Sequence, residues 1–197
     1  MRVKTLLVVA AAALLLSWAP MTFAQNLITN GSFETSDFTG WTTGGNFEDT
    51  EVVSGAFYDY TGAEDGNFYA VLGPVGSDGT LSQTFSDTAG QQYTISFWIA
   101  SVGDDPSDFS VKWDGTTLVS LSDPNTGANW SELTFSATGT GSDTLTFSFR
   151  DDPAYIGLDN VSVTAQSGTS VPEPSSILLM GSGVLAMAGV IRRKLGR

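Results

Sequence analysis

The sequence contains no cysteine and no histidine. Without cysteine the protein has no disulfide bond, no thiolate zinc site and no cysteine nucleophile. Without histidine it lacks the commonest general base and the commonest ligand of transition metals. The sequence also has no Gly-x-Ser-x-Gly motif and no phosphate-binding loop. These absences favour a protein that binds or supports over one that catalyses.

Cationic side chains are scarce. Residues 25–170 contain only Lys112 and Arg150 but 20 aspartates and glutamates, which gives this segment a formal charge of −18. Such a charge repels nucleic acid, so nucleic-acid binding is excluded. Carboxylate oxygens suit hard cations such as Ca²⁺, although an acidic surface also serves solubility alone.

The chain begins with a segment typical of a secretory signal. Arg2 and Lys4 precede the mostly apolar run Thr5–Leu16. Thr22 and Ala24 place small residues at the −3 and −1 positions of a cleavage site, so residues 1–24 are predicted to be a signal peptide. The alternative is an uncleaved anchor helix, which the short apolar run disfavours.

A second apolar run, Ile177–Ile191, lies near the C-terminus and contains 15 residues without a charge. At 1.5 Å per residue such a helix falls short of a hydrocarbon core of about 30 Å, but it can cross a thinned bilayer with snorkelling flanks. We expect a transmembrane segment at residues 177–191, with the cations that follow it on the cytoplasmic side. A buried C-terminal helix is the alternative, which three glycines and the lack of a polar face disfavour. Residues 166–175, rich in Ser, Thr, Gly and Pro, are predicted to be a linker.

The end of the chain combines Pro172-Glu173-Pro174, the apolar span and the basic cluster Arg192-Arg193-Lys194. In this order the three parts, residues 171–197, resemble the PEP-CTERM sorting signal of Gram-negative bacteria. The resemblance implies recognition by an exosortase, cleavage near Pro-Glu-Pro and at least transient anchoring in the inner membrane. It further implies an exported protein of the cell surface or the exopolysaccharide matrix of a biofilm. The apolar tail would then be a removable address, like the tail of some lipid-anchor signals.

The segment between the two ends shows no helical pattern. Gly, Ser, Thr, Asp and Asn interrupt it every several residues, and the runs between them are rich in aromatic and β-branched side chains. Eight strands at spacings near ten residues predict an all-β fold, a single β-sandwich jelly roll over residues 25–165. The predicted strands are Phe68–Leu72, Thr80–Phe85, Gln92–Ser101, Asp108–Trp113, Thr116–Leu121, Trp130–Ala137, Asp143–Asp151 and Ile156–Ala165.

Hydrophobic alternation predicts which strand residues face the core. Leu145, Phe147 and Phe149 alternate with Ser and Thr and should point inward. The run Ile95–Ala100 breaks strict alternation, which indicates a central strand covered on both faces, or a bulge. Asp114-Gly115 lies between two predicted strands and is a strong signal for a tight hairpin.

Two motifs frame the predicted jelly roll. The first is Asn30-Gly31-Ser32-Phe33-Glu34, followed by Gly40-Trp41, and the second is Leu158-Asp159-Asn160-Val161. They resemble the ends of the galactose-binding-like jelly-roll modules, a fold that many carbohydrate-binding modules share. The resemblance implies a structural Ca²⁺ that ties the first strand to the last, with Glu34 and Asp159 as the matching carboxylates. Two carboxylates plus loop carbonyls suit the 6–8 oxygens that Ca²⁺ takes. The alternative is that Glu34 caps a turn and Asp159 lies at a strand edge.

Aromatic side chains are candidates for stacking on sugar rings. Tyr58 and Tyr60 are two residues apart and would share one face of a strand, and Trp113 is the third candidate. Each of the three can instead be core, which is the default use of large aromatic side chains. Trp98 and Trp130 are expected to pack inside the fold, since they lie in or beside apolar strands.

Adjacent carboxylates occur at Asp104-Asp105 and Asp151-Asp152. Neighbouring residues of a strand point to opposite faces, so neither pair supplies the facing carboxyl groups of a glycosidase. We therefore predict a non-catalytic module that binds extracellular carbohydrate. Two alternatives stay open: a structural matrix or adhesion protein without specific sugar binding, and a glycoside hydrolase that uses a carboxylate pair distant in sequence.

Overall fold

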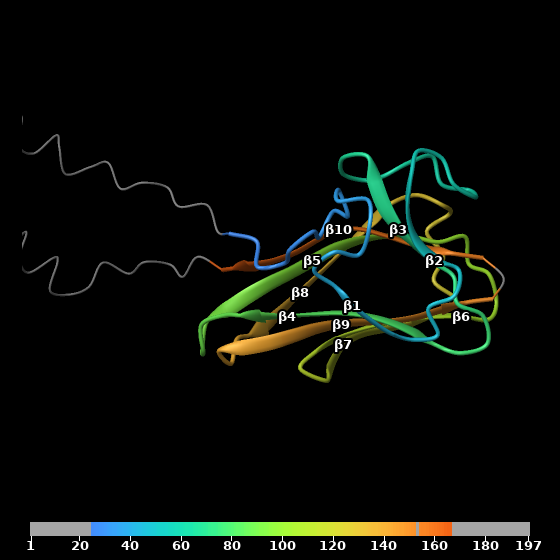
Figure 1. The fold of residues 1–197 in the computed structure, drawn as a ribbon. Coiled ribbons are helices and arrows are strands. Elements are labelled where there is room, and N and C mark those ends of the chain that lie inside the picture. Colours follow the sequence, from blue (N-terminus) through green and yellow to red (C-terminus); the bar gives the residue numbers. More distant parts are fainter. Residues whose placement is uncertain (1–24, 153, 167–197) are drawn as a thin grey trace, which may run out of the picture. The chain divides into compact units, whose positions relative to one another are not determined.

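The computed structural model describes residues 25–152 and 154–166, which form ten strands and, within these ranges, no helix (Figure 1). All eight predicted strands are found, with ends within one residue of the prediction. The two short strands β1 and β2 were not predicted. The strands are β1 (Thr42–Gly45), β2 (Thr50–Ser54), β3 (Phe68–Leu72), β4 (Gly79–Ser86), β5 (Gln92–Ala100), β6 (Ser107–Trp113), β7 (Thr116–Ser122), β8 (Ser131–Thr138), β9 (Ser142–Asp151) and β10 (Ile156–Ala165).

The strands form two five-stranded sheets that lie face to face (Figure 1). The first sheet has the order β1-β4-β9-β6-β7, and the second has the order β2-β3-β10-β5-β8. Every ladder between these strands is antiparallel. The prediction of an all-β jelly-roll sandwich is confirmed.

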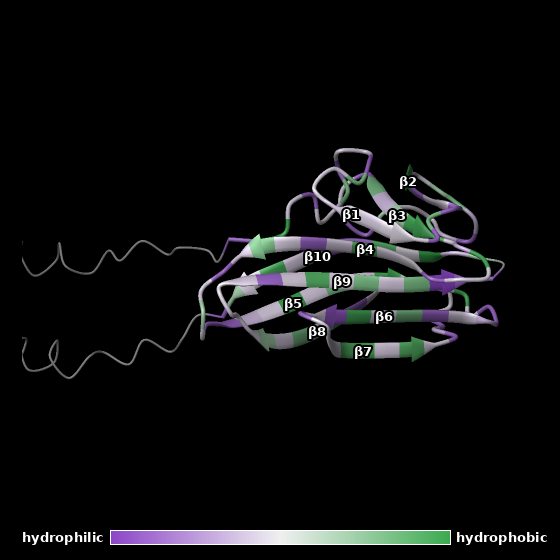
Figure 2. Cartoon of the chain, turned by 60° about the horizontal axis from the view of Figure 1, so that its bottom comes forward, coloured by the Kyte–Doolittle hydropathy of each residue, from purple (hydrophilic) through white to green (hydrophobic). Residues whose placement is uncertain are grey.

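The main core lies between the two sheets and is centred on β9. Leu145, Phe147 and Phe149 are fully buried, as their alternation with polar residues predicted. Figure 2 shows the same alternation of polar and apolar residues along the strands. Phe147 contacts the ring of Phe97 edge-on, with centroids 5.2 Å apart, and so joins the first sheet to the second. Burying one such side chain stabilises the fold by roughly 1.5–3 kcal/mol.

Strand β5 lies inside the second sheet, between β10 and β8. The predicted central position is therefore confirmed, but the strand keeps a regular alternation of buried and half-buried residues. Trp98 is half-buried on the outer face of the sheet, so the expectation that it packs in the core is wrong. The bulge lies on the partner strand, because the register of β10 against β5 shifts between Asp159 and Ser162, and Asn160 takes a φ of 49° there.

Residues 25–41 form no named strand, but they continue the second sheet beside the last half of β10. The amide of Leu27 donates to the carbonyl oxygen of Val163 (2.8 Å), and the amide of Val161 donates to that of Gly31 (2.9 Å). A Cβ at Gly31 would lie 2.0 Å from the carbonyl oxygen of Val161, so only glycine allows this approach. Phe33 is fully buried nearby. The Asn-Gly-Ser-Phe-Glu motif thus joins the start of the chain to its last strand.

A second, smaller cluster of buried side chains lies on the outer face of the second sheet. It contains Tyr60, Tyr69, Val71 and Ala100, and Trp130 packs against it. The loop between β2 and β3 covers it, and the indole Nε1 of Trp130 donates to the Gly62 carbonyl oxygen of that loop (2.9 Å). The prediction that Trp130 packs inside the fold is confirmed, with this outer cluster as its partner.

The chain from residue 25 to 166, called the body below, contains all the described strands and both clusters of buried side chains. It therefore carries its own hydrophobic core, as an independently folding domain does. The predicted signal peptide, residues 1–24, and the predicted transmembrane segment, residues 177–191, lie outside the described residues. Within the described residues no helix is long and apolar enough to span a membrane.

Candidate functional site

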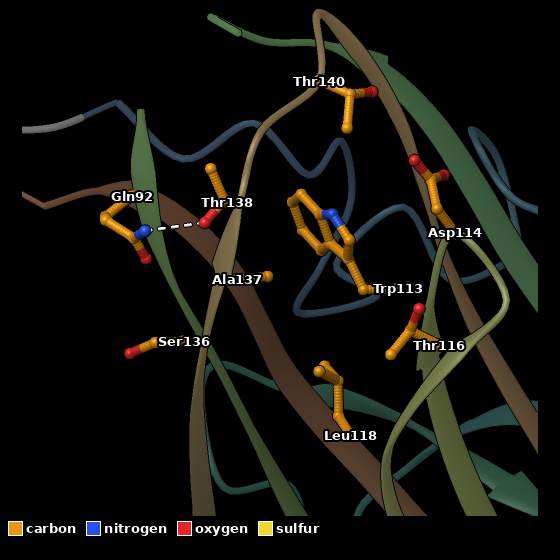
Figure 3. Close-up of a pocket in the computed structure, with 9 residues that line it drawn as sticks. All are labelled: Gln92, Trp113, Asp114, Thr116, Leu118, Ser136, Ala137, Thr138 and Thr140. Atoms are coloured by element: carbon orange, nitrogen blue, oxygen red, sulfur yellow. Dashed lines mark hydrogen bonds between the residues drawn. The ribbon is translucent and has the colours of Figure 1, made fainter. Parts of the chain in front are cut away.

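A pocket of about 400 Å³ lies where the edges of the two sheets face each other, between β8 of the second sheet and the β6–β7 hairpin of the first (Figure 3). This volume lies within the usual range of small-ligand sites. Three apolar and six polar side chains line the pocket. They are Trp113, Leu118 and Ala137, and Gln92, Asp114, Thr116, Ser136, Thr138 and Thr140.

Trp113, one of the three aromatic residues predicted from the sequence, lies in the middle of this pocket lining (Figure 3). It is the last residue of β6, and only 5% of its surface is exposed, because its ring packs against Phe85 and Tyr93 with centroids 5.4 and 6.3 Å away. Its Nε1–H is buried and has no acceptor among the described residues, a condition that costs about 1–3 kcal/mol. Most of the Trp113 ring therefore packs in the core, and only a small exposed part of it lines the pocket.

The polar part of the pocket offers both donors and acceptors. The amide nitrogen of Gln92 donates to the hydroxyl oxygen of Thr138 at 2.6 Å, the dashed line in Figure 3. Both side chains are exposed, as are those of Thr116 and Ser136. An amide and several hydroxyl groups around an indole edge can hydrogen-bond the hydroxyl groups of a sugar while the apolar side chains contact its C–H faces.

Asp114 forms the end of the pocket and occupies the predicted Asp-Gly hairpin. Asp114 and Gly115 have φ values of 45° and 77°, the left-handed pair that a two-residue hairpin needs. The Asp114 carboxylate accepts the amide of Thr144 at 2.8 Å, which fixes its direction. The predicted hairpin is confirmed, and it places a carboxyl group at the pocket.

Three aspartates meet beside this end of the pocket. Hydrogen bonding to Asp143 raises the pKa of Asp114, and burial together with Asp143 raises the pKa of Asp87. Asp143 is fully buried; burial alone would raise its pKa, but hydrogen bonds from Asp114, Asp87 and Thr140 lower it to about 2. Asp143 also accepts the backbone amide and the hydroxyl group of Thr140 at 2.9 and 2.7 Å, so its carboxylate holds the turn that precedes β9. The cluster therefore fits a structural role at the rim of the pocket.

Tyr58 and Tyr60 do not share one strand face. Phe57 and Tyr60 exchange backbone hydrogen bonds across a tight turn, and Tyr58 has a left-handed φ of 51° in it. Tyr58 is 56% exposed, whereas Tyr60 is 2% exposed and donates its hydroxyl hydrogen to the Tyr155 carbonyl oxygen. The prediction of a sugar-stacking ring is wrong for Tyr60, because the turn directs this ring into the outer cluster.

Tyr58, a candidate from the sequence, belongs to a small aromatic surface with Tyr155, a residue that the sequence did not indicate. Its ring meets Tyr155 edge-on, with centroids 5.8 Å apart, and the ring of Phe57 also meets Tyr155 edge-on, at 5.0 Å. Burial and the nearby carboxylates of Asp49 and Glu51 raise the pKa of the Tyr155 hydroxyl. The surface lies at the end of the sandwich where β10 begins, opposite the end that holds the Trp113 pocket, so Tyr58 and Trp113 do not form one site.

Glu34 and Asp159, the predicted calcium ligands, hold the same loop. Glu34 accepts the backbone amides of Asn67 and Phe68 at 2.7 and 2.8 Å. Asp159 is fully buried and accepts the amides of Glu64 and Asp65 at 2.8 and 3.0 Å.

These amide hydrogen bonds lower the pKa of the exposed Glu34. For Asp159, burial outweighs them and raises the pKa to about 7, with the charge of Glu64 adding to the shift. Oε2 of Glu34 accepts no backbone amide, whereas Oδ1 of Asp159 accepts the amide of Asn160 at 2.7 Å and keeps one lone pair. The described residues contain no group of three or more acidic, His or Cys side chains placed to hold a metal ion. The calcium prediction therefore stays a prediction.

Comparisons with known proteins support two predictions made from the sequence: the C-terminal sorting motif and the jelly-roll fold. The chain carries a PEP-CTERM protein-sorting motif at residues 170–194, which contains Pro172-Glu173-Pro174 and Arg192-Arg193-Lys194. These residues lie outside the part of the chain that the structure describes. A search for sequence relatives among curated proteins found no match.

The body has the jelly-roll fold of carbohydrate-binding modules. TmCBM61, solved in complex with β-1,4-galactotriose, has a TM-score of 0.59 and 21% identity, over 73% of this chain and 100% of that chain. The K2 cleaved adhesin domain of Lys-gingipain has a TM-score of 0.50 and 18% identity, over 72% and 98% of the two chains. The enzymatically active domain of tailspike protein 4 from bacteriophage CBA120 has a TM-score of 0.52 and 16% identity, but only 21% of that chain is covered. At these identities the likeness concerns the fold alone.

Proposed function

We propose that this protein is an exported, exosortase-sorted surface protein that binds extracellular carbohydrate without catalysis, in the pocket around Trp113. The observation that carries the proposal is the composition of that pocket: an indole edge and two aliphatic side chains lie among an amide, a carboxyl group and four hydroxyl groups. This mixture matches a sugar, whose ring has apolar faces and a polar rim. The fold shared with carbohydrate-binding modules supports the same class of ligand.

The charge of the protein narrows the class of carbohydrate. Residues 25–170 have a formal charge of −18, and Asp114 lines the pocket itself. An acidic polysaccharide would be repelled at close range, since the pocket lining contains no cationic side chain. The proposed ligand is therefore a neutral polysaccharide or the neutral segment of one.

The structural calcium implied by the family resemblance stays part of this proposal. Glu34 lies in the segment that precedes the first strand, and Asp159 lies on the last strand. Both accept amides of the loop that precedes β3, and a cation bound between this loop and the two carboxylates would tie the two ends of the body together. Its contribution would be structural, because both carboxylates lie away from the residues that line the pocket. The predicted exosortase, the cell surface or matrix location and the transient membrane anchor likewise stay proposals that rest on the sorting motif.

The proposal is tested by affinity electrophoresis of the body through gels that contain neutral polysaccharides (β-glucan, galactan, xylan, mannan) or acidic ones (alginate, polygalacturonate). We expect retardation by at least one neutral polysaccharide and by no acidic one. Thr138→Ala removes a hydroxyl group of the pocket and should weaken this retardation. Thr134→Ala is the matched control, because Thr134 is exposed on the same strand but does not line the pocket.

Two results would count against the pocket. Retardation that is equal in Thr138→Ala, Trp113→Phe and the wild-type body, but lost in Tyr58→Ala, would move the site to the aromatic surface at the other end. No retardation by any polysaccharide would favour the structural matrix or adhesion role instead. Release of reducing sugar from the polysaccharide that retards the body would instead support the alternative of a glycoside hydrolase.

A further inference from the structure

A buried carboxylate outside the pocket lies at the other end of the first sheet. Asp151 is the last residue of β9, where it pairs with Ser107, whereas Trp113 pairs with Leu145 at the far end of the same ladder. Six residues of strand, roughly 20 Å, separate the two positions. Asp151 is therefore too far from Trp113 to contact a sugar bound in the pocket.

The Asp151 side chain is fully buried, and neither of its oxygens accepts a hydrogen bond from the described residues. The nearby backbone amide of Ala154 lowers the pKa of Asp151, but it does not reach hydrogen-bond geometry with either carboxylate oxygen. A buried carboxylate is ordinarily paired or hydrogen-bonded, because removing its charge from water is costly. This carboxylate has neither kind of partner within the described chain.

A second carboxylate shares this position. Asp104 lies on the loop between β5 and β6, and its Oδ2 is also buried without a hydrogen-bond partner among the described residues. After burial, the charge of Asp104 is the largest cause that raises the pKa of Asp151, to about 7, and Asp152 and Asp123 add to it. Ser107 pairs with Asp151 across the β6–β9 ladder, and its hydroxyl donates to the Asp104 carbonyl oxygen (2.7 Å), so the backbone brings the two unpartnered carboxylates to the same end of the sandwich.

No cationic side chain of the body compensates this charge. Arg150 bonds Asp152 through its Nε at 3.0 Å and through an ion pair, and it points away with the alternating residues of β9. Lys112, the other cationic residue between residues 25 and 166, is exposed beside Trp113 at the far end of β6.

We propose that Asp151 and Asp104 are ligands of a bound Ca²⁺, at a site separate from Glu34 and Asp159. Ca²⁺ takes oxygen ligands and accepts carboxylates together with backbone carbonyls and water. Among the described residues no third acidic side chain forms a ligand group with them, so the two aspartates are the whole side-chain part of the shell. Loop carbonyls and water supply the rest.

The surrounding hydrogen bonds show what such an ion would stabilise. The Ser107 hydroxyl donates to the Asp104 carbonyl oxygen (2.7 Å), and the Ser107 amide donates to the Asp123 carboxylate (2.9 Å). The amide of Asp152 donates to the Pro106 carbonyl oxygen (3.1 Å). The loops after β5, β7 and β9 therefore already meet here, and a cation between Asp104 and Asp151 joins the first of them to the last.

The test is calcium titration of the chelator-treated body by isothermal calorimetry, with thermal unfolding in Ca²⁺ and in chelator. We expect the wild-type body to bind Ca²⁺ and to melt at a higher temperature with it. Asp151→Asn and Asp104→Asn should each remove one bound Ca²⁺ per chain, or weaken its binding at least tenfold. Asp159→Asn should retain that ion, which separates this site from the predicted clamp.

Asp105→Asn is the matched control, because Asp105 adjoins Asp104 but is exposed. It should bind Ca²⁺ as the wild-type body does. Should Asp151→Asn fail to fold by circular dichroism, the half-exposed Asp104 carries the test alone. The proposal would be overturned if Asp104→Asn and Asp151→Asn bound Ca²⁺ with the stoichiometry and affinity of the wild-type body. It would also be overturned if the wild-type body bound no Ca²⁺, since Asp151 would then be buried as the neutral acid.

Discussion

The contact between Gly31 and Val161 allows a sharp prediction about how the body closes. In Gly31→Ala the new Cβ would lie 2.0 Å from the Val161 carbonyl oxygen and 3.0 Å from its carbonyl carbon. Both are backbone atoms of β10, which cannot rotate away as a side chain can. Residues 25–31 must then move from β10 by about 1 Å, which lengthens hydrogen bonds of 2.9 Å beyond their effective range.

Four hydrogen bonds depend on this approach. Two are the backbone bonds of Leu27 and Val161, and two join the Asn26 side chain to the Val161 carbonyl oxygen (3.2 Å) and the Val163 amide (2.9 Å). At about 1 kcal/mol each, their loss together with looser packing of Ile28 should lower the free energy of unfolding by about 3–5 kcal/mol. Urea unfolding of the body, followed by tryptophan fluorescence, measures this difference.

Gly44→Ala is the control for this experiment. A Cβ at Gly44 would meet only the Thr80 hydroxyl at 2.8 Å, and that side chain can rotate, so the loss should stay below about 1 kcal/mol. A Gly31→Ala body as stable as the Gly44→Ala body would refute the view that the Asn-Gly motif is required by packing against the last strand.

Two further substitutions test the two clusters of buried side chains, each measured by urea unfolding of the body. Tyr60→Phe removes the hydrogen bond to the Tyr155 carbonyl oxygen from a buried ring and should cost about 1–2 kcal/mol; an unchanged midpoint would contradict the role given to that hydroxyl. Phe147→Ala empties the centre of the main core, between Phe97 and Trp41, and should cost about 3–5 kcal/mol, whereas its outward neighbour Thr146→Ala should cost less than about 1 kcal/mol.

The two ends of the sandwich differ in chemistry. The pocket end combines Trp113 with hydroxyl groups, an amide and the Asp114 carboxyl group, while the opposite end combines Asp104 and Asp151 with the exposed ring of Tyr58. Loss of calcium binding and loss of sugar binding should therefore appear in different variants. A single substitution that abolishes both would point to global unfolding instead.

Strand prediction succeeded where burial follows local pattern. Leu145, Phe147 and Phe149 alternate with small polar residues, so the side-chain period of a strand alone placed them inside. It failed for β1 and β2, which are short and contain glycine or few apolar residues, so their local pattern differs little from that of a loop. They are strands because β4 and β3 offer edges to pair with.

The candidate sites were predicted less well, because they depend on contacts that the local pattern does not show. Spacing placed Tyr58 and Tyr60 on one face, but a left-handed residue in a turn separated them. The sequence showed Asp151 only as a neighbour of Asp152 on a strand, because sequence neighbours do not show which loops will fold over a strand end. Asp104 is brought to the same end of the sandwich by the pairing of β6 with β9 and by the hydrogen bond from the Ser107 hydroxyl to its carbonyl oxygen.

The sequence alone determined the class of fold and the C-terminal sorting motif, since both depend on composition, periodicity and motifs that are local along the chain. It also marked Gly31, Phe33 and Asp159 as special, through two motifs at opposite ends of the body. Tertiary structure decided which aromatic rings stay exposed, where hydroxyl groups gather around Trp113, and which carboxylates lose contact with water. Those properties depend on contacts between residues far apart in the chain, and only the stacking of the two sheets sets them.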